Sequence, residues 1–292
     1  MSIQKEPFEV VCPDGVPLRG VLLIPDSPKA VVQFNAGTAA KKEFYLPFLE
    51  YLVDDGFLCC LWDYRGNGDS APPSLKGCDH EFLDYGLYDI PTVKSFLRKK
   101  FPGLPFLFVG HSAGGQMIGF TQDLFDVKGL IGLAVSTGYM RYMPLGYRML
   151  SYFFFKMFSP VSNAVFGYVA AKRFGIMEDL PKNVVKQWHA WCRRPTYFFD
   201  KRFFGQSVPL GNFKKYQFPV QVYWANDDPI SNKRSVPAYW NNVSSSEEIR
   251  LKKLTPRELG LGKIEHFGYF SRKLKENLWK EVRDTLNDFI VR

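Results

Sequence analysis

The segment that decides the fold is PFLFVGHSAG, residues 105–114. Its first five residues form an apolar run of the kind found in strands that are buried on both faces of a parallel sheet. Glycines then stand two residues before and two residues after Ser112, and they give a serine on a tight turn the clearance it needs. The segment therefore predicts a strand, a sharp turn and a helix, with Ser112 as a candidate nucleophile and an ordinary turn serine as the alternative.

The composition predicts one sizeable core. The chain has 292 residues, of which 46% are hydrophobic, and a chain of this length buries roughly 75% of its unfolded surface. The net charge is +9, but the basic residues are scattered among carboxylates, which argues against a nucleic-acid partner. The five cysteines are a poor disulfide framework, because their number is odd and Cys59 adjoins Cys60 in an apolar run.

Two segments bear on the location of the chain. The first ten residues carry Lys5, Glu6 and Glu9 and lack the apolar stretch of a secretory signal. Together with reduced cysteines, this predicts a cytoplasmic protein. The most membrane-like stretch, residues 152–171, is interrupted by polar residues such as Lys156, and is typical of a surface that touches an interface transiently without stable insertion.

Strand-like runs alternate with helical segments along most of the chain. Asp14-Gly15 between two apolar runs predicts an N-terminal hairpin. The alternation that follows predicts an α/β fold, with a mostly parallel β-sheet and helices on both of its faces. The expected strands are residues 8–12, 16–24, 29–35, 57–63, 105–109, 130–136, 220–225 and 249–254, and the expected helices are residues 44–54, 88–100, 116–124, 231–241 and 271–290.

The alternation stops between residues 137 and 218, in a stretch rich in aromatic side chains. This stretch is too long for a plain loop. We expect an inserted helical cap over residues 137–218, between the two parts of a core domain at residues 1–136 and 219–292. Phe154 and Trp188 are candidates for substrate binding in this cap, and the alternative is that its aromatic side chains form the cap's own core.

A serine hydroxyl needs a base, and a carboxylate that orients the base, to become a good nucleophile. Among the four histidines, His266 follows the last expected strand, from where its ring can reach Ser112. His111 adjoins the serine, and we expect its ring to point away. The carboxylate is expected after the strand at 220–225, where Asp227 and Asp228 adjoin; we favour Asp228, with Asp227 as the alternative.

The charge that develops on a substrate carbonyl needs two backbone N–H donors. One is expected from Ala113, the residue after the candidate nucleophile. The second is expected after the strand at 29–35, where the residues are small enough for close approach of a substrate; Thr38 is the preferred donor and Gly37 the alternative. No group of residues has the spacing of metal ligands, so we expect no metal and no organic cofactor.

Taken together, these residues resemble the α/β-hydrolase superfamily. The order Ser112, Asp228, His266 matches its Ser, Asp/Glu, His order, and residues 110–114 match its G-x-S-x-G turn. Residues 63–70, DYRGNGDS, look like the D-x-R-G-x-G-x-S segment of many members. The resemblance spans nearly the whole chain and implies the α/β-hydrolase fold with a variable cap.

The resemblance also implies an activity. We expect a serine hydrolase that cleaves carboxylic esters of short to medium acyl chains through an acyl-enzyme intermediate. Its partner would be a small-molecule ester, with water as the second substrate. A thioesterase, an acyltransferase or a serine peptidase would use the same triad, and a non-catalytic ligand-binding protein is a further alternative, because the fold alone does not determine the substrate.

Overall fold

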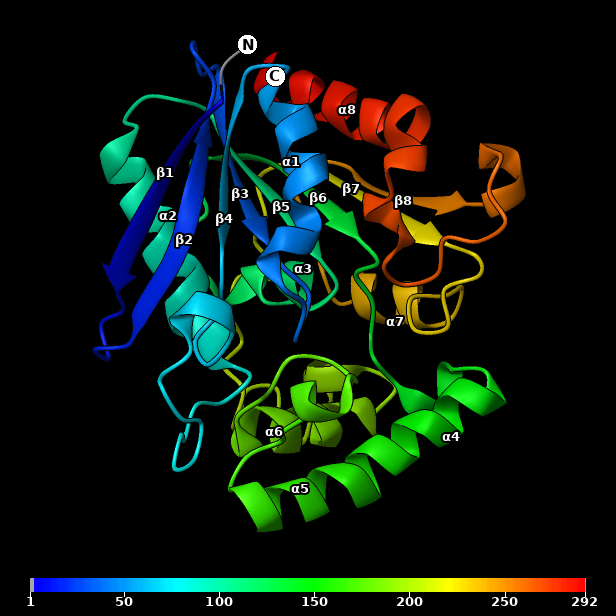
Figure 1. Ribbon diagram of the computed structural model, residues 1–292. Helices are drawn as coiled ribbons and strands as arrows, with labels where there is room; N and C mark the ends of the chain where they lie inside the picture. Colours follow the sequence, from blue (N-terminus) through cyan, green and yellow to red (C-terminus); the bar gives the residue numbers. More distant parts are fainter. Residues whose placement is uncertain (1–2, 292) are drawn as a thin grey trace.

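The sheet is the framework of the molecule (Figure 1). The computed structural model describes residues 3–291. Eight strands lie in the order β1-β2-β4-β3-β5-β6-β7-β8. β1 is antiparallel to β2 and β2 to β4, whereas all other neighbours are parallel, which confirms the predicted fold class. The strands are β1 (Gln4–Val11), β2 (Pro17–Ile24), β3 (Ala30–Asn35), β4 (Phe57–Trp62), β5 (Phe106–His111), β6 (Val127–Leu133), β7 (Val220–Ala225) and β8 (Ile249–Leu254).

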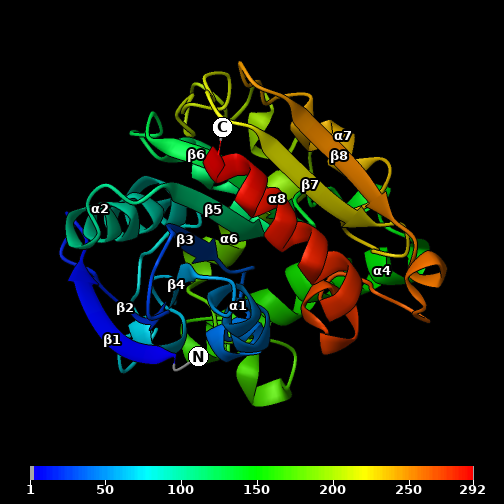
Figure 2. The ribbon, with the colours of Figure 1, turned by 90° about the horizontal axis from the view of Figure 1, so that it is seen from above.

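Helices cover both faces of the sheet (Figure 2). A Cβ at Gly129 of β6 would meet Phe289 of α8, whereas one at Gly132 would approach Trp240 of α7. Positions three apart in a strand face opposite sides, so α8 and α7 lie on opposite faces. Figure 2 shows α1 beside α8, with α2 across the sheet from them. The helices are α1 (Leu46–Val53), α2 (Ile90–Lys100), α3 (Ala113–Gln116), α4 (Leu145–Phe153), α5 (Ser159–Phe166), α6 (Lys182–Cys192), α7 (Ser235–Trp240) and α8 (Lys280–Val291).

The core is centred on the middle of the sheet. Every residue of β3, β4 and β5 is buried. Strands that are covered on both faces read as continuous apolar runs, and this is why their positions could be predicted to within a few residues.

The prediction of a helix at residues 116–124 was wrong. After the tight turn the chain forms only the four-residue α3 and then a short 3-10 turn. Three glycines follow the serine in this stretch, and glycine is the weakest helix former after proline. The carbonyl oxygens of Gly119 and Thr121 accept hydrogen bonds from Asn212, at 2.6 and 2.9 Å, and not from a further helical turn.

Residues 137–218, which we call the insertion, leave the sheet after β6. They include α4, α5 and α6, and these helices lie at the lower end of Figure 1, below the carboxyl ends of the parallel strands. α4, the π-helical turn Phe154–Phe158 and α5 follow one another without a break. Among residues 3–291, no helix combines the length and the apolar character that a membrane span requires.

The last part of the insertion packs on the body of the protein. The rings of Phe198 and Phe213 lie 5.2 and 4.8 Å from that of Phe120, between centroids. The ring of Phe199 lies 5.3 Å from that of Tyr239 in α7. This part of the chain therefore covers the sheet face that carries α7 on its way to β7.

Candidate active site

Ser112 lies on the sharp turn between β5 and α3. Its backbone has φ +49° and ψ −117°, a conformation that is strained for any residue with a side chain. The turn tolerates no side chain at Gly114, where a Cβ would collide with the carbonyl of Asn35, or at Gly110, where it would collide with the backbone of α3. The N–H of Ser112 donates to the carbonyl oxygen of Leu133 in β6 at 2.9 Å, which ties the turn to the sheet.

The structure brings Ser112, His266 and Asp228 together at the carboxyl edge of the sheet. The distance from Ser112 Oγ to His266 Nε2 is 3.0 Å, and the distance from His266 Nδ1 to Asp228 Oδ2 is 2.8 Å. In the tautomer that serves both contacts, Nδ1–H donates to the carboxylate and Nε2 accepts from the hydroxyl. His266 and Asp228 are buried, and Ser112 is partly exposed.

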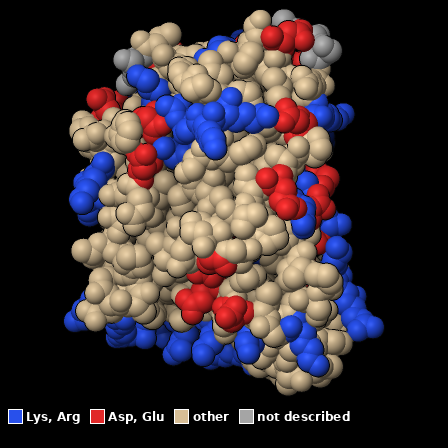
Figure 3. Space-filling model, turned by 90° about the vertical axis from the view of Figure 1, so that its left-hand side faces the viewer, with Lys and Arg blue, Asp and Glu red and all other residues tan. Residues whose placement is uncertain are grey.

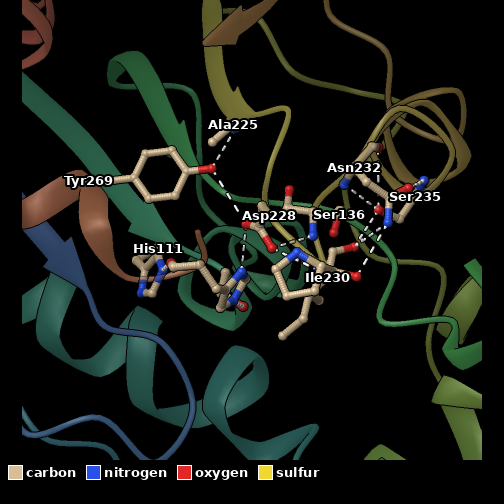
Figure 4. A network of polar contacts seen from close by, with 12 residues as sticks. His111, Ser136, Ala225, Asp228, Ile230, Asn232, Ser235 and Tyr269 are labelled. Carbon is tan, nitrogen blue, oxygen red and sulfur yellow. Dashed lines mark hydrogen bonds and ion pairs between the residues drawn. The ribbon is translucent and has the colours of Figure 1, made fainter. Parts of the chain in front are cut away.

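The Asp228 carboxylate is held from both sides (Figure 4). Its Oδ1 accepts hydrogen bonds from the N–H groups of Ile230 at 2.8 Å and Ser231 at 2.9 Å. Its Oδ2 also accepts from the hydroxyl of Tyr269 at 3.4 Å, and that hydroxyl accepts from the N–H of Ala225 at 2.7 Å. Burial raises the pKa of Tyr269 well above its ordinary value, so the phenol stays a neutral donor.

Asp227 has a different partner from its neighbour. Its Oδ2 accepts from the N–H of Ile264 at 2.9 Å, and this contact holds the loop that leads to His266. Of the two aspartates that the sequence left open, Asp228 is therefore the one in contact with the histidine ring.

His111 joins three loops that are distant in sequence. Its Nε2 lies 2.9 Å from the carbonyl oxygen of His266, which can only accept, so Nε2 carries the proton. Its Nδ1 then accepts from the hydroxyl of Tyr45 at 2.9 Å, and that hydroxyl accepts from the N–H of Gly37 at 3.1 Å. Burial, with a smaller effect of His266, lowers the pKa of His111 to about 3, so the ring is neutral. No local pattern in the sequence indicates this role for Tyr45.

The candidate oxyanion donors differ in whether their N–H groups are free. Ala113 is the first residue of α3, so its N–H has no acceptor within the helix. Over residues 3–291, the N–H groups of Ala113 and Thr38 make no hydrogen bond. The N–H of Gly37 is already donated to Tyr45, which leaves Thr38 as the better placed of the two candidates after β3.

Comparisons with known proteins agree with this architecture. Residues 26–164 match the family model described as serine aminopeptidase, S33, and no curated protein matches the sequence. A carboxyl esterase from Bacillus coagulans superposes with a TM-score of 0.65 at 13% identity, over 99% of this chain and 100% of the other. Est1E from Butyrivibrio proteoclasticus, solved with ferulic acid, has a TM-score of 0.62 at 16% identity, over 98% and 100% of the two chains. The chain has the fold of the α/β hydrolases.

A cleft of about 820 Å³ opens beside His266. Aromatic side chains from three parts of the fold line it, among them Phe44, Tyr147 of α4 and Phe267. Glu265 is the one acidic residue in the lining, and its carboxylate pairs with Lys263 at 3.0 Å. The cleft is therefore largely apolar, and its carboxylate is paired with a lysine. Sequence reasoning missed Phe44 and Tyr147, because neither lies near the candidate triad in the sequence.

The two aromatic residues expected to bind substrate lie outside this cleft. Phe154 is buried, and its ring centroid lies 6.3 Å from that of Trp188. Trp188 also packs edge-on to Phe155 at 5.1 Å and lies 6.0 Å from Phe82. Neither Phe154 nor Trp188 lines the cleft beside His266, so their part in binding substrate stays a prediction.

Proposed function

We propose that this α/β hydrolase cleaves carboxylic esters through an acyl-enzyme intermediate. Ser112 Oγ attacks the ester carbonyl while His266 Nε2 takes its proton, and Asp228 orients and stabilises the charged ring. The N–H groups of Ala113 and Thr38 hold the oxyanion. The histidine then returns the proton to the leaving alcohol, and water repeats the sequence to release the acid and free Ser112.

The observation that carries this proposal is the unbroken chain of contacts from Ser112 through His266 to Asp228. A nucleophile within hydrogen-bond reach of a base, which is itself oriented by a third group, is the geometry of nucleophilic catalysis. The contacts of 3.0 and 2.8 Å supply it without rearrangement.

The cleft favours esters over peptides as substrates. An aminopeptidase needs a free anion to bind the ammonium group of its substrate, and Glu265 in the cleft is already paired. Glu178 of the insertion is paired as well, with Lys172 at 3.1 Å and Lys41 at 3.7 Å. The two solved structures named above are also described as an esterase and as bound to ferulic acid. The family model is named for an aminopeptidase, so peptide hydrolysis is the second candidate.

The test is a substrate panel with a covalent readout. The purified full chain is assayed on p-nitrophenyl esters of graded acyl length, on matched thioesters and on aminoacyl p-nitroanilides, and its intact mass is recorded after a brief quench. We expect ester turnover and an acyl adduct that Ser112→Ala abolishes. Faster cleavage of the anilides would establish the peptidase instead. If neither an acyl adduct nor labelling by a fluorophosphonate is found, the protein is not a serine hydrolase, and the ligand-binding alternative is favoured.

A cytoplasmic location is part of the proposal. The five cysteines are all unpaired, and four of them are buried, as suits a reducing compartment. Fractionation of cells that express the full chain tests the location, and recovery of the chain outside the cytoplasm would contradict it.

A further inference from the structure

The outer side of the insertion carries a row of apolar side chains that nothing covers. Seven residues of α4, α5 and the π-helical turn between them are 52–68% exposed. Six of them recur every fourth position, a spacing that makes each side chain a neighbour of the next on the helix surface. At about 1.5 Å per residue the row is roughly 30 Å long. We call this row the apolar ridge: Leu145, Met149, Leu150, Phe153, Met157, Val161 and Val165.

The helix that bears the apolar ridge lies on the outside of the molecule. In Figure 1, α4 and α5 follow the lower edge, with the sheet on the far side of the insertion. A contiguous exposed apolar surface of this kind on a folded protein marks an interaction site.

The segment that carries the ridge has charged side chains of one sign. Residues 127–177 contain no Asp or Glu, but they contain six Lys or Arg. Figure 3 shows Lys and Arg side chains along the lower edge of the molecule, the end formed by the insertion in Figure 1. The surface next to the ridge therefore suits an anionic partner.

Four of the basic side chains of the insertion share one pocket. The pocket has a volume of about 340 Å³, and no carboxylate lines it. Over the described residues none of the four cations makes a salt bridge, and the buried Nε of one of them, Arg194, has no hydrogen-bond partner. We call this the cationic pocket: Arg141, Lys156, Arg193 and Arg194 line it, with Tyr139 and Tyr152.

The cationic pocket borders the apolar ridge. Tyr152 and Lys156 line the pocket, and each precedes a ridge residue, Phe153 and Met157, by one position on the same helix. Neighbouring positions on a helix lie about 100° apart around its axis. A ligand that fills the pocket would therefore lie next to a surface that covers the ridge.

We propose that this face docks on a bilayer that contains anionic phospholipids. The apolar ridge lies in the boundary between headgroups and acyl chains, and the phosphate of one lipid occupies the cationic pocket. An exposed apolar helix face flanked by Lys and Arg is the pattern of helices that lie in a membrane interface. The proposal concerns binding alone and does not depend on the proposed esterase activity.

The charge pattern argues against a second copy of the chain as the occupant. A two-fold contact places the same patch on both partners. Here it would bring two copies of a basic segment without Asp or Glu together, and like charges oppose association. A small soluble anion, in turn, would fill the pocket but leave the ridge exposed.

The experiment is a sedimentation assay of the full chain with vesicles. One set of vesicles is phosphatidylcholine alone, and the other contains about one third phosphatidylglycerol. We expect binding to the anionic vesicles only, and its loss at about 0.5 M NaCl, where charges are screened beyond roughly 4 Å. Ser112→Ala protein is measured in parallel and should bind equally well, so a failure of the esterase proposal leaves this result interpretable.

Two variants separate the contributions of the pocket and the ridge. The double variant Arg141→Gln/Lys156→Gln should weaken partitioning about 30-fold, because each cation near an anionic surface contributes a factor of about five. Met157→Glu should weaken it about tenfold or more, since it places a carboxylate in the ridge. The matched controls are Lys99→Gln/Lys253→Gln, which removes the same net charge from α2 and β8, and Phe125→Glu, which alters an exposed apolar residue outside the insertion. Both controls should bind as the wild type does.

Four outcomes would overturn the proposal. They are equal binding to both kinds of vesicle, equal losses in the controls and the variants, binding of inorganic phosphate to the pocket without vesicle binding, and a dimer in light scattering that Met157→Glu dissociates. The last would show that a second copy covers the apolar ridge.

Discussion

The carboxyl edge of the sheet and the outer side of the insertion place polar and apolar side chains in opposite ways. At the sheet edge, the carboxylate of Asp228 and the ring of His266 are buried, and each is hydrogen-bonded. On the insertion, apolar side chains face solvent and the cations of one pocket have no counter-ion among the described residues. Chemistry needs groups held in one geometry, whereas a docking surface needs groups left unsatisfied until a partner arrives.

The sheet edge should be the most sensitive to substitution. Ser112→Ala removes the nucleophile, and we expect kcat on p-nitrophenyl esters to fall by roughly four to six orders of magnitude. The melting temperature should not change, because among residues 3–291 the hydroxyl has no hydrogen bond besides that to His266. Ser27→Ala, on the exposed surface, is the control. Activity above a tenth of the wild-type value would mean that the nucleophile lies elsewhere.

Within the sheet edge, the adjacent residues Asp227 and Asp228 should differ in their effect on kcat. Asp228→Asn should lower kcat on the order of 10⁴-fold, because an amide cannot hold the histidine in the required tautomer or stabilise its charge. Asp227→Asn should lower kcat less than about tenfold, since its carboxylate contacts the backbone N–H of Ile264. Steady-state assays of both variants at one pH measure the two losses of kcat. A larger loss in Asp227→Asn than in Asp228→Asn would show that Asp227 is the carboxylate that orients His266.

Substitutions on the inner side of the insertion should change the stability of the protein and not its preference for acyl length. Phe154→Ala should lower the free energy of unfolding by about 3–5 kcal/mol, as for other buried phenylalanines. Phe153→Ala, its exposed neighbour, should cost less than about 1 kcal/mol. Urea unfolding measures both. The dependence of kcat/KM on acyl length should be the same in the two variants; a shift in the preferred acyl length in Phe154→Ala alone would place Phe154 in the substrate pocket, as the sequence led us to expect.

The smallest effect concerns the pH dependence of stability. In the folded chain the pKa of His111 is lowered from 6.5 to about 3, so the unfolded chain binds this proton first. Stability is therefore lost as the pH falls below about 6.5. Between pH 7 and pH 5 the wild type should lose about 2 kcal/mol more than His111→Gln in urea unfolding. Equal losses in the two proteins would show that His111 titrates in the folded state over this range.

Features set by local pattern could be predicted from the sequence. The central strands are buried on both faces and read as apolar runs. Ser112, Asp228 and His266 each follow a strand of the same parallel sheet, so one edge had to receive all three.

Features set by tertiary contact could not be predicted in this way. The two partners of His111 lie 66 and 155 positions away in the sequence, and no local pattern links Tyr45 to that ring. The short α3 was missed because the hydrogen bonds from Asn212 that replace the helix come from the far end of the insertion. Phe154 and Trp188 were assigned from aromatic content alone, so their part in binding substrate stays a prediction.

The packing of residues 197–213 limits how this protein could be rebuilt by grafting. An exchange of the whole of residues 137–218 for a foreign segment would also remove Phe198 and Phe213, whose rings cover Phe120 just beyond the turn that carries Ser112. The protein would then lose part of its own core along with the exchanged segment. A splice that ends before residue 197 keeps those rings in place, so only the earlier portion, with α4, α5 and α6, is an exchangeable module.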